Sequence, residues 1–93
     1  MDSRYHILGE ETLSVGSVAV SLANIPVVGL DGAIVQVELA DVRVKSKGTP
    51  TATDGFKLEG GTQTELSGFD LPTVKFIAVS GTARVQVAYY GVS

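Results

Sequence analysis

The sequence predicts an all-β protein, a small antiparallel β-sandwich or barrel of about seven to eight short strands. Two observations support this fold class. Short segments in which apolar and polar residues alternate recur along the chain, and glycine, proline and other turn residues separate them. Eleven glycines stand beside a single methionine and no tryptophan, and valine and threonine are frequent, which favours strands and turns over helices.

Length and composition narrow the classes of protein further. The 93 residues suffice for one domain, and we expect residues 1–11 to form an N-terminal arm or short first strand and residues 12–93 a single β-sandwich domain. The absence of cysteine excludes disulfides and thiolate metal sites. A net charge of -3 with scattered acidic residues and no basic patch argues against nucleic acid as a partner. No apolar run approaches the roughly 20 residues of a membrane span, and the N-terminus lacks a signal-peptide pattern.

The first third of the chain shows the weakest alternation. A short strand over Arg4–Leu8 is one interpretation of the polar N-terminus. Alternation is clearer over Thr12–Leu22, although Gly16 and Ser17 interrupt it and predict a bulge or turn. The proline and glycines of Asn24–Gly32 indicate a connection.

The middle of the chain predicts two strands that are out of phase. Apolar residues occupy odd positions in Ala33–Leu39 and even positions in Val42–Lys47. A change of one residue must therefore occur at Ala40 and Asp41, through a bulge in one long strand or a tight corner between two strands. The residues expected to face the core are Val35, Val37, Leu39, Val42 and Val44.

Turn residues and short alternating segments follow. Gly48–Gly55 (GTPTATDG) is predicted to be a loop. A short alternating strand is expected around Phe56 and Leu58, and a short polar strand over Thr62–Leu66. The connection after it carries Phe69 and Leu71, which we expect to cover an edge of the core.

The segment LPTVKFIAVSGTARVQVAYY, Leu71–Tyr90, is expected to form a hairpin that folds back at Ser80 and Gly81. Pairing Val79 with Thr82 places apolar residues opposite one another on one face, in the pairs Ala78–Ala83, Phe76–Val85 and Val74–Val87. The same alternation directs Tyr89 inward and directs Ile77 and Tyr90 outward.

The residue types of a catalytic site are missing from the sequence. The single histidine, His6, has no cysteine or second histidine to act with, which argues against a hydrolase built on a nucleophile and its base. The four aspartates at turns are explained by hydrogen bonding to their own backbone, and no cluster of acids suits calcium. We therefore expect a protein that is not an enzyme and that needs neither a cofactor nor a metal.

Five segments between Ala33 and Tyr90 form a familiar pattern: AIVQVE, VRVK, GTPTATDGFKLEGG, ELSG and VKFIAVSGTARVQVAYY. Through these segments the sequence resembles small virion proteins of tailed bacteriophages. Here Gly48-Thr49-Pro50 stands where the family often has one more residue before the proline, so we expect a shorter loop. The resemblance implies a structural role in the virion, after assembly in the bacterial cytoplasm: such proteins decorate or cement the capsid, form head fibres or join tail parts.

The expected function is therefore contact with other virion subunits, above all the major capsid protein. The resemblance suggests a homo-oligomer, with a trimer favoured over a dimer, and neither nucleic acid nor a membrane is an expected partner. We expect the N-terminal arm, Met1–Gly9, to take part in attachment, together with side chains of the loop region and one outward tyrosine. These candidate contact residues are Lys45, Lys47, Thr49, Pro50, Thr51, Thr53, Phe56 and Tyr90. The alternative is a tail- or fibre-associated module that binds a carbohydrate or host receptor through Tyr90 and the loops.

Overall fold

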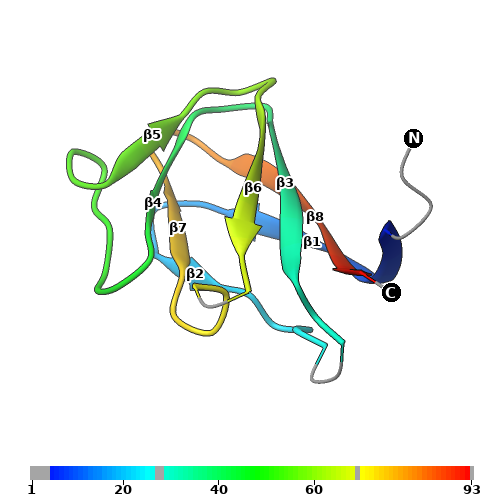
Figure 1. The fold of residues 1–93 in the computed structure, drawn as a ribbon. Coiled ribbons are helices and arrows are strands. Elements are labelled where there is room, and N and C mark those ends of the chain that lie inside the picture. The colour runs from blue at the N-terminus through cyan, green and yellow to red at the C-terminus, as the bar shows by residue number, and fades with distance from the viewer. Residues whose placement is uncertain (1–4, 27–28, 69, 93) are drawn as a thin grey trace.

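The computed structural model describes residues 5–26, 29–68 and 70–92, and it confirms the all-β fold class. Two four-stranded antiparallel sheets pack into a sandwich, not a closed barrel (Figure 1). Sheet A contains, in spatial order, β1 (Tyr5–Val15), β8 (Ala83–Val92), β3 (Gly32–Glu38) and β6 (Gln63–Ser67). Sheet B contains β2 (Val20–Ser21), β7 (Lys75–Ala78), β4 (Val42–Lys45) and β5 (Phe56–Leu58).

The core lies between the two sheets and is built from alternate residues of their strands. Sheet A contributes inward side chains such as Val35, Val85 and Tyr89, each with no exposed surface, and sheet B contributes Val42 and Phe76 in the same way. Because successive side chains of a strand point to opposite faces, this alternation leaves a polar outer face on each sheet. The complete core cluster is Leu13, Val15, Leu22, Ala33, Val35, Val37, Val42, Val44, Leu71, Val74, Phe76, Ala78, Ala83, Val85, Val87 and Tyr89.

The predicted hairpin between the last two strands is wrong. β7 pairs with β2 and β4 in sheet B, whereas β8 pairs with β1 and β3 in sheet A, so residues 79–82 carry the chain from one sheet to the other. The apolar faces of β7 and β8 meet across the core instead of lying side by side. Both arrangements bury the same alternate residues, which is why Val74, Phe76, Val85 and Val87 are core residues as predicted.

The phase change after β3 is a tight corner, one of the two predicted solutions. β3 ends at Glu38 in sheet A and β4 begins at Val42 in sheet B. The prediction that Leu39 faces the core is wrong, because Leu39 has φ 76° and is 73% exposed. A left-handed backbone conformation is unfavourable for leucine, and here it lets the chain leave one sheet and enter the other. Asp41 supports the corner by accepting a hydrogen bond from the backbone N of Gly60 at 2.9 Å.

The N-terminal region is part of the sandwich over all of its described length. Residues 5–11 form the first part of β1, which pairs with β8 and has a register shift between Ile7 and Gly9. Of the two interpretations of residues 1–11, an arm or a short first strand, the structure shows a strand from Tyr5 onward, and residues 1–4 and Phe69 lie outside the described residues. The predicted interruption at Gly16 is confirmed, since β1 ends at Val15. Ile77 points outward from β7, beside Arg43, as predicted, yet it is covered and only 8% exposed.

Tyr89 is a buried tyrosine that is tied to an acidic residue. Its side chain has no exposed surface, and its hydroxyl donates a hydrogen bond to Glu11 Oε2. Glu11 in turn accepts hydrogen bonds from the backbone N atoms of Ala23 and Asn24, at 3.2 and 2.9 Å. Burial, followed by the hydrogen bond and negative charge of Glu11, raises the pKa of Tyr89 well above its ordinary value.

We expect this raised pKa to make the fold sensitive to alkali. A tyrosine in the unfolded chain loses its proton at about pH 10, whereas folded Tyr89 keeps its proton to higher pH. The free energy of unfolding should therefore fall as the pH rises above about 10. Urea unfolding of the parent and of Tyr89→Phe across this pH range measures the effect. Phenylalanine has no ionisable hydroxyl, so this fall in the free energy of unfolding should be absent from Tyr89→Phe. Tyr90→Phe is the matched control and should retain the fall. An identical pH dependence for the parent and Tyr89→Phe would contradict the prediction.

Candidate partner-binding surface

The connection between β4 and β5, residues 46–55, is a loop that folds over the outer face of sheet B. Arg43 points outward from β4 and holds the loop through two hydrogen bonds. Its Nε donates to the carbonyl O of Ala52 at 3.0 Å, and its Nη1 donates to the carbonyl O of Gly55 at 2.8 Å. One side chain of the sheet thus fixes two points of the loop backbone, and the predicted loop is confirmed as a braced structure.

Further contacts order the 46–55 loop from within. Lys45 Nζ lies 2.9 Å from Asp54 Oδ2, and the hydrogen bond and positive charge of Lys45 lower the pKa of Asp54. Thr51 and Asp54 exchange two backbone hydrogen bonds, N to O, at 3.0 and 3.2 Å. Pro50 is almost fully buried, so its side chain anchors the loop. Pro50 was expected to be a direct contact residue, but its side chain is covered in this structure.

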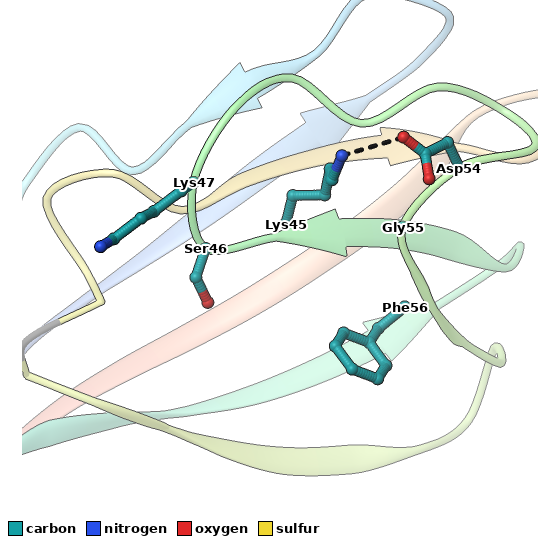
Figure 2. Close-up of a pocket in the computed structure, with 6 residues that line it drawn as sticks. All are labelled: Lys45, Ser46, Lys47, Asp54, Gly55 and Phe56. Atoms are coloured by element: carbon teal, nitrogen blue, oxygen red, sulfur yellow. Dashed lines mark hydrogen bonds and ion pairs between the residues drawn. The ribbon is translucent and has the colours of Figure 1, made fainter.

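Beside the loop lies a depression of about 440 Å³, lined by Lys45, Ser46, Lys47, Asp54, Gly55 and Phe56 (Figure 2). Figure 2 shows Lys45 directed at Asp54, whereas the exposed side chain of Lys47 extends away from that ion pair. Phe56 is 81% exposed and is the most exposed large hydrophobic residue of those the structure describes. A cationic side chain and an aromatic ring are therefore offered together at the surface.

The exposure of Phe56 follows from its place at the edge of sheet B. Phe56 pairs with Val44, so its ring is on the inner side of the sheet, but β5 is the edge strand and the ring extends past the core. A second depression, of about 270 Å³, lies between β5 and β6 and shares Phe56 with the first. Its lining includes Leu58 and Leu66. The ring thus lies above an apolar groove at the open side of the sandwich.

The outer face of sheet B is basic. The register places Arg43 beside Lys57 and Lys45 beside Lys75, and all four alternate with inward residues. Two carboxylates compensate part of this charge: Asp54 pairs with Lys45, and Asp41 lies 3.6 Å from Lys57. Together with Lys47 the face retains an excess of positive charge. The outer face of sheet A is of opposite character: it carries Glu10, Glu38 and Glu65, and Arg84 lies beside Glu38.

Most of the predicted contact residues lie in one region. Thr49, Thr51 and Thr53 are exposed on the loop, next to Lys45, Lys47 and Phe56. Tyr90 does not join them, because it lies on β8 in sheet A. Figure 1 shows the end of β8, in red, on the opposite side of the sandwich from the green loop between β4 and β5. Sequence reasoning missed Lys57 and Lys75 as members of the basic face, since only strand pairing places them beside β4.

Comparison with family models, curated proteins and solved structures gave no match for this chain. Over residues 5–26, 29–68 and 70–92, no three histidine or acidic side chains gather in a way that would hold a metal ion. The same residues include no helix with the length and apolar character needed to cross a membrane.

Proposed function

We propose that the protein is a structural component of a tailed-bacteriophage virion, a capsid decoration or cement protein that binds and stabilises the head shell. The contact surface is the 46–55 loop, Phe56 and the basic outer face of sheet B, which we call the docking surface. The observation that carries the proposal is the pairing of an exposed aromatic ring with a loop already held in place by Arg43 and Asp54. The resemblance of residues 33–90 to small phage virion proteins supports the identity of the partner.

The order of the loop favours binding because little conformational freedom is left to lose. The conformational entropy that side chains and loops lose at an interface opposes association. The 46–55 loop is already ordered by its hydrogen bonds, so it loses less entropy when it binds. Phe56 supplies apolar area that docking removes from water, worth about 25 cal/mol per Å². Aromatic residues of this kind are enriched among the few side chains that dominate binding energy.

The charge of the docking surface selects the chemistry of the partner. Lys47 and the basic side chains of sheet B complement an acidic patch on a shell subunit, which speeds encounter and orients the partners. Each exposed ion pair is worth only about 0–1 kcal/mol, so the affinity must come from several contacts. A homo-oligomer, with a trimer favoured, multiplies these contacts because the second and third are made at high effective concentration.

We expect Phe56→Ala to weaken binding to capsids assembled without the protein by about 30-fold or more, as removal of a central aromatic contact does. Co-sedimentation of purified protein with such capsids over a range of concentrations measures the affinity. The matched control is Val18→Ala, which removes another exposed apolar side chain from the connection between β1 and β2, at the far edge of sheet B.

Three outcomes separate the parts of this proposal. Loss of binding in Phe56→Ala but not in Val18→Ala supports the docking surface. Equal binding by the parent and Phe56→Ala rejects this surface but retains a virion role. A parent protein that does not bind the capsids at all rejects the decoration function itself.

A further inference from the structure

The outer face of sheet A carries an unbroken row of polar side chains across all four strands. The register places Thr12 beside Gln86, Gln86 beside Gln36, and Gln36 beside Gln63. Thr12 Oγ1 donates a hydrogen bond to Gln86 Oε1 at 2.7 Å, and Gln86 Nε2 donates to Glu38 Oε1 at 3.3 Å. Gln86 is thereby held in place, while Gln36 and Gln63 are exposed. Each amide offers both hydrogen-bond donors and acceptors to a ligand.

An aromatic ring lies next to this row, in a space that a glycine provides. Tyr90 is half-buried and is the cross-strand neighbour of Gly32. A Cβ atom at Gly32 would lie 2.8 Å from the hydroxyl O of Tyr90 and 3.1 Å from its Cζ. Any other residue at position 32 would therefore push the ring away from the sheet. The glycine allows the tyrosine to rest against β3 while part of its surface remains exposed.

Two adjoining depressions run along this face. The first, of about 320 Å³, is lined by His6, Ile7, Ile34, Glu65 and Tyr90. The second, of about 150 Å³, is lined by Glu10, Ile34, Gln36, Gln63, Gln86, Val87 and Ala88. Ile34 belongs to both, so they form one elongated surface that leads from the tyrosine to the glutamine row. We call this surface the Tyr90 face.

We propose that the Tyr90 face binds a neutral oligosaccharide. A pyranose ring has an apolar face of C–H groups that packs against an aromatic ring, and hydroxyl groups at its rim that both donate and accept hydrogen bonds. The Tyr90 face offers the ring and, a short way along, amides and carboxylates for the hydroxyls. Two joined depressions suit a chain of sugar units better than one monosaccharide.

The charges of the Tyr90 face explain the choice of a neutral sugar. Glu10 and Glu65 would repel a uronic acid or a sulfated sugar. Arg84, elsewhere on the outer face of sheet A, is already committed to Glu38: its Nε lies 2.7 Å from Glu38 Oε1, and this contact lowers the pKa of that carboxyl. The Tyr90 face and the docking surface belong to different sheets, so this proposal does not depend on capsid attachment.

Nuclear magnetic resonance titration of isotope-labelled protein tests the proposal. The probes are three soluble neutral oligosaccharides, of β-1,4-linked glucose, α-1,4-linked glucose and β-1,4-linked N-acetylglucosamine, with an oligogalacturonate as the anionic comparison. We expect at least one neutral sugar to give saturable shifts of the backbone amides of Gln36, Ala88 and Tyr90. Tyr90→Ala should weaken that binding by about tenfold or more, and Tyr90→Phe, which keeps the ring, should restore most of it.

Phe56→Ala is the matched control, because it removes an exposed ring from the docking surface and should leave sugar binding unchanged. The proposal is overturned if none of the three neutral sugars shifts these amides, or if the oligogalacturonate binds at least as tightly. It is also overturned if Tyr90→Ala instead lowers the sedimentation coefficient of the protein without changing sugar binding, since the face would then join two copies of the chain.

Discussion

Replacing Phe76 with alanine is expected to lower the free energy of unfolding by about 3–5 kcal/mol. Phe76 lies on β7 with no exposed surface, between its cross-strand neighbours Val20 and Val44 and opposite the inner face of sheet A. Truncation removes apolar area from the core and leaves a cavity that a two-sheet packing closes only in part. Urea unfolding followed by circular dichroism measures the change.

The matched control for this experiment is the same substitution at an exposed phenylalanine. Phe56→Ala removes an identical side chain that is 81% exposed, so we expect a change within about 0.5 kcal/mol. A loss below about 1 kcal/mol in Phe76→Ala would mean that the ring is outside the core. The pair of variants therefore tests the orientation of β7 and β5 together.

Replacing Gly32 with alanine is expected to cost about 3 kcal/mol, at the upper end of the range for overpacking. A Cβ at this position would lie 2.5 Å from the backbone O of Leu66 and 2.8 Å from the hydroxyl O of Tyr90. The tyrosine can move aside, but the backbone oxygen belongs to β6, which is paired with β3. Relief of that contact requires the strand pairing itself to shift.

Gly16→Ala is the control, because a Cβ there meets nothing within 4 Å, and its expected effect is within about 0.5 kcal/mol. The double variant Gly32→Ala/Tyr90→Ala should recover only part of the lost stability, since the contact with Leu66 remains. Full recovery in the double variant would show that Tyr90, and not β6, limits the space at Gly32. Thermal and urea unfolding of the four proteins give the comparison.

The candidate contact region could be predicted in part from the chain. Turn residues in GTPTATDG predicted the loop, and alternation in β4 predicted that Arg43 and Lys45 point outward. Burial of Pro50 could not be predicted, because it depends on how the loop folds back over sheet B. Phe56 was named as a contact residue from the sequence, but the degree of its exposure could not be predicted, since an apolar residue in an alternating segment is buried only where a second sheet covers it.

For β3, β4, β7 and β8 the sequence by itself determined which residues face inward. Alternation is a property of neighbouring residues, so Phe76 and Val85 were assigned to the core without knowledge of their partners. The tertiary structure alone decided that β7 and β8 belong to different sheets, that Leu39 turns outward at the corner, and that four basic side chains share one face. Two amphipathic strands can bury their apolar faces side by side in one sheet or facing each other across a core. The alternation of apolar and polar residues along each strand is the same in both cases. The choice is made by the other strands, whose own apolar faces must be covered at the same time.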